Sequence, residues 1–314
     1  MLGLGSVRHA RLLAALAAGA TWGCTAPLRP PEDTTYYTKV RVAGTGACAL
    51  GEDGYLRCWG DPADGAPTDV EIVDFDFGDQ HGCAVTEEGG GRCWAWHGER
   101  DGRIGPALAV PDGVWRVVAT TALTTCWLSE AGNISCAGVG DFAEEVPPEG
   151  TFDAIAGGSS HYCASAPAGD ALNCWGWDGA VASAAQLPAA NLTAFDAGDT
   201  VTCTLTNGGV VVCAGMHYWD GGPAEMAPKG RFGAISAGQT ICMLDGAGSV
   251  HCEYLDWITD PSRCVIPDTR YHIVGSSFSA VCAGADVGGL WCWADDPTGR
   301  GCSVDEPAKL AWGS

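Results

Sequence analysis

The sequence is poor in basic residues. Its 314 residues include 16 Lys and Arg against 38 Asp and Glu, which gives a formal net charge of −22. A chain with this charge repels the phosphate backbone of nucleic acids, and it avoids anionic membrane surfaces unless a lipid holds it there. We therefore expect no nucleic-acid partner, and membrane contact only through a lipid anchor.

The familiar motifs of catalysis and metal binding are also missing. The chain contains no HExxH, no GxSxG and no phosphate-cradling glycine loop. No two cysteines are separated by two residues, the spacing typical of redox catalysts and of many zinc sites. The acidic stretches GDPADGAPTD and WADDPTGRGCSVDE lack the ordered ligand spacing of a calcium loop and are interpreted as solvated turns. We expect no catalytic residues, no cofactor and no metal.

Long apolar runs are absent, and the first 24 residues hold a short one. Two arginines precede LLAALAAGA, and TWGC follows, which is the order of a secretory signal. The run is too short to span a membrane. A cysteine after a small residue is typical of a bacterial lipoprotein cleavage site, so we predict a signal over residues 1–23 and a lipid on Cys24. The alternative is plain secretion with cleavage near Gly23. Either way, the mature chain has 14 Lys and Arg against 38 Asp and Glu, or −24.

Cysteine is plentiful, and its 17 copies reveal an internal repeat. Pairs ten or eleven residues apart recur at intervals of about 40 residues, and a glycine lies six positions after the first cysteine of every pair. The predicted pairs are Cys48–Cys58, Cys83–Cys93, Cys126–Cys136, Cys163–Cys174, Cys203–Cys213, Cys242–Cys252 and Cys282–Cys292. So many cysteines indicate an oxidising compartment.

The spacing within a pair predicts a stapled hairpin. In CALGEDGYLRCWG, folding about Asp53 sets Leu50 opposite Leu56 and leaves a three-residue loop that ends at Gly54. The last residue of such a loop takes the left-handed conformation, which glycine adopts at least cost. Cys48 and Cys58 then face each other across two strands, close enough for a disulfide.

Each hairpin is preceded by an apolar segment such as EIVDFDFG, WRVVAT or RFGAISAG, which we interpret as one buried strand. Three strands per unit and seven units predict an all-β, seven-bladed β-propeller with short, mainly three-stranded blades. We place a short flexible tether at residues 24–35 and the propeller at residues 36–314.

These units resemble the regulator of chromosome condensation repeat. The resemblance rests on VAGTGACALGEDGYLRCWG, AIAGGSSHYCASAPAGDALNCWGW and AFDAGDTVTCTLTNGGVVVC, and it covers nearly the whole mature chain. Their short length is closest to the compact bacterial versions, which include a secreted β-lactamase inhibitor. The resemblance implies a propeller fold and a role in binding. The third and seventh units depart from the Ala-Gly pattern.

Two further cysteines remain after the seven pairs and Cys24. Cys264 and Cys302 follow the last cysteine of units six and seven in similar contexts, DPSRC and DPTGRGC. Equivalent loops of adjacent blades lie side by side, so we predict a Cys264–Cys302 disulfide. The alternatives are two free thiols or a bridge to another molecule.

Histidines and aromatics are the remaining candidates for function. His81 and His161 precede the first cysteine of their units, where we expect a structural hydrogen bond inside the blade. Several aromatics follow the second cysteine and predict a recognition patch on one face, near the ring opening. The alternative is that each packs between blades. The predicted patch consists of Trp96, Trp177, Tyr218, Trp219 and Trp257.

Together these features predict an exported, non-catalytic binding scaffold in the bacterial cell envelope, either an outer-membrane lipoprotein or a secreted protein. Its partner would be a protein or a polysaccharide. Two other classes stay open. One is a hydrolase or lyase with carboxylates converging in the central funnel, and the other is a secreted enzyme inhibitor.

Overall fold

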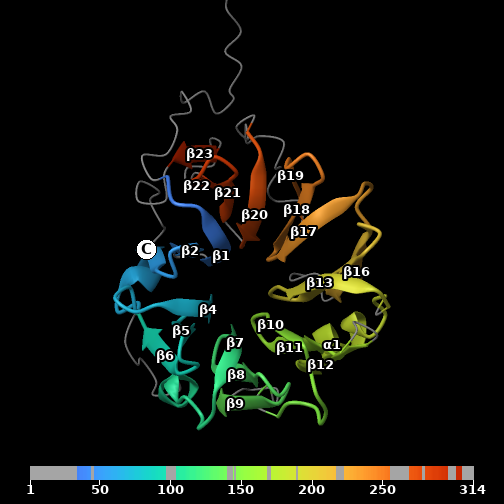
Figure 1. The fold of residues 1–314 in the computed structure, drawn as a ribbon. Helices are drawn as coiled ribbons and strands as arrows, with labels where there is room; N and C mark the ends of the chain where they lie inside the picture. The colour runs from blue at the N-terminus through green and yellow to red at the C-terminus, as the bar shows by residue number, and fades with distance from the viewer. Residues whose placement is uncertain are drawn as a thin grey trace, which may run out of the picture.

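The structure is a computed structural model that describes residues 34–43, 46–96, 104–139, 144, 146–167, 171–188, 190–216, 223–254, 269–277, 280–295 and 302–305. These residues form seven antiparallel sheets arranged as the blades of a ring (Figure 1). The predicted seven-bladed, all-β propeller is confirmed. Among the described residues, no helix has the length and apolar content needed to cross a bilayer.

Every blade has an inner, a middle and an outer strand in chain order. The inner strands surround the centre of the ring and are β1 (Tyr37–Ala43), β4 (Ile72–Phe77), β7 (Trp115–Thr120), β10 (Ala154–Gly157), β13 (Leu192–Ala197), β17 (Phe232–Ala237) and β20 (Tyr271–Ser276). The middle strands are β2 (Gly46–Gly51), β5 (His81–Thr86), β8 (Thr124–Ser129), β11 (His161–Ser165), β14 (Val201–Thr206), β18 (Thr240–Asp245) and β21 (Ala280–Ala285). The outer strands are β3 (Leu56–Gly60), β6 (Gly91–Ala95), β9 (Ile134–Gly138), β12 (Leu172–Gly176), β15 (Val211–Met216), β19 (Val250–Tyr254) and β22 (Leu290–Asp295).

Two blades carry a fourth strand that the repeat did not predict. β16 (Pro223–Met226) pairs with β15, and β23 (Cys302–Asp305) pairs with β22. Both added strands reach the second cysteine of the blade, Cys213 in one case and Cys292 in the other. The described helical segments are short: η1 (Asp61–Ala63), η2 (Gly105–Leu108) and α1 (Asp178–Ala184).

The hairpins have the predicted register. Leu50 pairs with Leu56, Cys48 pairs with Cys58, and Gly54 has a φ of 77°. A disulfide crosses each of the seven hairpins, with Cα atoms 4.0–4.1 Å apart. The predicted pairing of the fourteen repeat cysteines is therefore confirmed.

The turn glycines also join neighbouring blades. The carbonyl of Gly54 accepts the backbone N–H of Ile72, the first residue of the next inner strand, at 2.8 Å. The same bond recurs from Trp115 to Gly89 and from Phe232 to Gly209. The residues that open these inner strands are buried. At these three joins, one backbone hydrogen bond and one buried apolar residue set the position of a blade against the preceding blade.

The ring closes between its first and last blades. Tyr37 and Val40 of β1 pack with Cys282 and Leu290 of the seventh blade in one buried cluster. The N–H of Gly289 donates to the Thr35 carbonyl at 2.8 Å. Closure leaves a narrow central space bordered by the ends of the inner strands.

Candidate functional site

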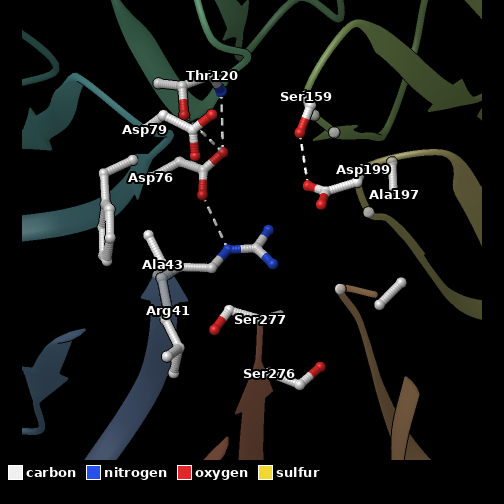
Figure 2. A pocket seen from close by; sticks show the side chains of 17 residues that line it. Arg41, Ala43, Asp76, Asp79, Thr120, Ser159, Ala197, Asp199, Ser276 and Ser277 are labelled. Atoms are coloured by element: carbon white, nitrogen blue, oxygen red, sulfur yellow. Dashed lines mark hydrogen bonds and ion pairs between the residues drawn. The ribbon is translucent and has the colours of Figure 1, made fainter. Parts of the chain in front are cut away.

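The described residues enclose a pocket of about 180 Å³ on the axis of the ring (Figure 2). Its walls come from all seven blades, because every inner strand ends there. The residues contributed by these strands include Arg41, Asp76, Thr120, Gly157, Ala197, Ala237 and Ser276. Glycines that follow the strands, such as Gly158, Gly198 and Gly238, line the pocket without side chains and so leave it open.

Arg41 is the cation at the base of this pocket. Its Nε lies 2.9 Å from Asp76 Oδ1 of the second blade, and its Nη1 lies 3.1 Å from Asp196 Oδ1 of the fifth blade. The three residues hold the same place in their repeats, since each pairs with the first cysteine of its own blade. One guanidinium therefore links three blades through the axis.

Both carboxylates also bind the inner strand of the following blade. Asp76 Oδ2 accepts the backbone N–H of Thr120 at 2.9 Å, and Asp196 Oδ2 accepts that of Ala237 at 2.8 Å. In the sixth blade Ser236 Oγ accepts the N–H of Ser276 at 3.0 Å in the same way. Charge and hydrogen bonding thus satisfy Asp76 and Asp196 within the fold.

Two further carboxylates stand closer to the mouth of the pocket. Asp199 Oδ1 accepts a hydrogen bond from Ser159 Oγ at 2.5 Å, and its Oδ2 accepts one from Gln239 Nε2 at 2.6 Å. Asp79 is exposed on the opposite side of the open space (Figure 2). Within the described part of the chain, neither carboxylate has a Lys, Arg or His as an ion-pair partner.

Burial and neighbouring charge set the protonation of these groups. Burial alone would lower the pKa of Arg41, but the attraction of Asp196 and Asp76 outweighs it, and the pKa lies above the ordinary value. Burial raises the pKa of Asp76, which Arg41 partly offsets. Although Asp79 is exposed on one side, the surrounding pocket walls partly desolvate its carboxylate, and this desolvation and then the charge of Asp199 raise the pKa of Asp79. Negative charge at the mouth is therefore not fully compensated by the protein.

His81 and His161 are buried and structural, as expected, but their bonds run between blades. His81 Nε2 lies 2.8 Å from Thr125 Oγ1 of the next blade, and His161 Nε2 lies 2.9 Å from Thr202 Oγ1. The Thr125 hydroxyl donates to the Ala107 carbonyl at 2.9 Å, so His81 Nε2 is the donor of its own bond. The expectation that each hydrogen bond lies inside one blade was wrong, because both bonds join neighbouring blades.

The predicted aromatic patch is not assembled by the two of its residues that the structure describes. Trp96 is 3% exposed, donates from Nε1 to the Asp79 carbonyl at 3.1 Å and packs edge-on against Phe77. Trp96 also lies in one buried cluster with Ala43 and Leu50 of the first blade, so for this residue the alternative of packing between blades is correct. Trp177 is half-buried and directly precedes α1, the helix that follows the outer strand β12. Figure 1 shows α1 away from the centre of the ring. Tyr218, Trp219 and Trp257 lie outside the described residues, as do Cys24 and Cys264; of Cys302 only the strand placement is described.

No group of three or more His, Cys, Asp and Glu suited to a metal ion occurs among the described residues. The pocket residues that sequence reasoning missed are Arg41, Asp76, Asp79, Asp196 and Asp199. A signal was present, because DFGD (76–79) and DAGD (196–199) occupy matching positions in units two and five. Only ring closure reveals that they face a common axis.

Comparison with known proteins places the fold. No protein-family model and no curated protein sequence matches this chain. Solved structures do match. The ectodomain of the Physcomitrella patens receptor kinase CR4 is 20% identical, with 83% of this chain and 74% of that chain covered and a TM-score of 0.64. The CRINKLY WD40 ectodomain of the Arabidopsis thaliana receptor kinase ACR4 is 16% identical, with 83% and 96% covered and a TM-score of 0.63.

Prp20p from Saccharomyces cerevisiae, the yeast RCC1, is 15% identical, with 83% of this chain and 82% of that chain covered and a TM-score of 0.54. At such identities the likeness concerns the fold alone. The chain therefore has an RCC1-like β-propeller fold.

Proposed function

We propose that this protein is an exported, non-catalytic binding propeller that a lipid on Cys24 holds in the bacterial cell envelope. Its partner is a protein or a polysaccharide, and the axial face with Asp79 and Asp199 is the face that meets it. The observation that carries this proposal is the disulfide across every hairpin. Disulfides persist in oxidising compartments, which supports a location outside the cytoplasm.

The chemistry of the pocket supports binding over catalysis. Asp76 and Asp196 are committed to Arg41 and to backbone N–H groups, so neither is free to act as a base or a nucleophile. Propellers of similar fold serve as binding domains: the structure of Prp20p was described together with its binding to Gsp1p and histones. Those partners belong to Prp20p. What supports the same kind of role here is the shared fold and the open axial face.

The lipid anchor and the binding role can be tested together. Full-length protein should partition with membranes, and Cys24→Ser should move it to the soluble fraction. A wild-type protein that is already soluble would contradict the anchor. When the disulfide-bonded protein is chemically cross-linked to its neighbours in envelope extracts and recovered, one envelope component should be enriched with it. The reduced, unfolded protein should enrich no such component. Equal recovery by both forms would contradict a folded binding face.

A hydrolase or lyase is the second candidate, because carboxylates do converge on the axis. The raised pKa of Asp79 opposite Asp199 is the pattern of a general acid facing a base. If this candidate is correct, polysaccharide cleavage by the wild type should be lost in Asp79→Asn. Binding of the polysaccharide without cleavage would favour the scaffold instead.

A further inference from the structure

The four axial aspartates form two pairs supplied by the same two blades. DFGD gives Asp76 and Asp79 in the second blade, and DAGD gives Asp196 and Asp199 in the fifth. The first aspartate of each motif lies on an inner strand, and the second lies three residues later, beyond the end of that strand. The motifs thus set one pair deep in the ring and a second pair nearer the mouth.

The deep pair shows which chemistry this arrangement binds. Asp76 and Asp196 hold a single guanidinium between them, that of Arg41, at 2.9 Å and 3.1 Å. Arg41 belongs to neither of these two blades: it lies on β1 of the first blade, and its side chain reaches into the central space (Figure 2). The ring therefore already contains one cation clamp made from opposite blades. A planar guanidinium suits it, because its N–H groups reach two carboxylates at once.

The outer pair has no such cation in the described structure. Ser159 and Gln239 orient Asp199 with neutral hydrogen bonds that leave its charge in place. Lys39 pairs with Asp74 at 2.6 Å and Arg41 serves the deep pair, so the nearby cations are already engaged. Among the described residues, Lys39 and Arg41 form ion pairs with Asp74, Asp76 and Asp196, and no ion pair joins either cation to Asp79 or Asp199.

We propose that Asp79 and Asp199 form a second clamp, which receives the guanidinium or ammonium group of an arginine or lysine side chain on a partner protein. This inference rests on the proposed binding function and names the partner's chemistry at that same site. A pocket of about 180 Å³ is smaller than the sites that enclose drug-sized ligands, so it fits the end of one side chain. Asp79 and Asp199 would bind the cationic group of the partner as Asp76 and Asp196 bind the guanidinium of Arg41.

An NMR titration of the full-length, oxidised protein tests this directly. The probe is arginine capped at both ends, which carries one positive charge, and the matched neutral probe is capped citrulline. Capped arginine should shift the amides of Gly158, Ser159 and Gly198, and added salt should weaken it. Citrulline, which has the same shape without the charge, should bind at least about tenfold more weakly.

Two double variants separate the clamp from general attraction. Asp79→Asn with Asp199→Asn should weaken capped arginine at least about tenfold. Glu71→Gln with Glu87→Gln removes the same charge at the opposite end of the second blade, where Glu71 precedes β4 and Glu87 lies in the next hairpin turn. This control should leave binding unchanged. If Asp79→Asn with Asp199→Asn fails to fold, the comparison of capped arginine with capped citrulline on the wild-type protein still tests whether the site selects a positive charge.

Several results would overturn the proposal. These are equal binding of both probes, equal loss in both double variants, no shift at tens of millimolar probe, or calcium ions that shift these amides while arginine does not. None of these results would contradict the proposed binding function, because capture of a partner from the envelope tests that function separately.

Discussion

The guanidinium of Arg41 in the first blade lies 3.1 Å from the carboxylate of Asp196 in the fifth, although 155 residues separate them in the chain. Asp76 of the second blade holds the other edge of the same guanidinium. A charge carried by one repeat therefore fastens two others across the axis. It also sets the electrostatics of the face that we propose for binding.

Arg41→Met tests the structural part of this relationship. It leaves two nearly buried carboxylates without a counter-charge, which costs about 3–5 kcal/mol for a fully buried pair. Because the Arg41 side chain is 23% exposed, we expect a loss of about 2–4 kcal/mol in the free energy of unfolding, measured by urea denaturation. Arg57→Met removes an exposed pair with Asp53 and should cost less than about 1 kcal/mol. Equal effects would contradict the axial role of Arg41.

Acid should destabilise the propeller through His81 and His161, which are buried in the described structure. Burial lowers the pKa of His81 and of His161 to about 4 from an ordinary 6.5. Between these values the unfolded chain binds protons that the folded chain does not, so stability falls as the pH drops from 6.5 towards 4. Each histidine contributes at most roughly 3 kcal/mol to this loss.

The double variant His81→Gln with His161→Gln isolates that contribution from the other groups that titrate. Its urea midpoint should change less than that of the wild type between about pH 7.5 and about pH 4.5. The same pH dependence in both proteins would show that these histidines do not cause the acid sensitivity.

Gly89→Ala should weaken the join between the second and third blades. Gly89 has a φ of 78°, and a Cβ there would lie 2.5 Å from Val114 Cγ1 and 3.3 Å from the Trp115 carbonyl oxygen. Strain and contact together predict a loss of about 1–3 kcal/mol. Gly233 is the matched control, because a Cβ there meets nothing within 4 Å. A larger cost for Gly233→Ala in thermal unfolding would contradict this account of the hairpin turns.

The disulfide framework predicts the result of peptide mapping under non-reducing conditions. Seven links should join cysteines within a repeat, and an eighth should join Cys264 to Cys302. Replacing Cys203 and Cys213 by serine should lower stability by roughly 3 kcal/mol on the chain-entropy model, since the bridge closes a short loop. Links between the paired cysteines of different repeats would contradict the assignment of blades.

Much of the fold could be predicted because its determinants are local. The spacing of Cys48, Gly54 and Cys58 determines strand, turn and register within thirteen residues. Six of the seven hairpins have this cysteine spacing, and the fourth has one residue more. The added strands β16 and β23 could not be predicted, because each depends on whether an outer edge is free to pair. Neither lies in the part of the unit that repeats.

The site was harder to predict because it depends on closure of the ring. Arg41, Asp76 and Asp196 hold one repeat position, yet the sequence does not indicate which blades face each other. Trp96 illustrates the opposite error. An aromatic after an outer strand suggests a surface patch, but here its side chain turns inward onto Phe77. Burial of a single tryptophan depends on packing that no local pattern specifies.

If the axial face binds a partner, site-specific photo-cross-linking in the cell envelope should capture the partner at that face. A photoreactive residue replaces Gln80, which is exposed beside Asp79, or Glu87, which is exposed at the opposite end of the blade. We expect a discrete cross-linked product from position 80 that disappears in Asp79→Asn with Asp199→Asn, and no product from position 87. A product from position 87 alone, or one from position 80 that survives neutralisation of both aspartates, would contradict this expectation.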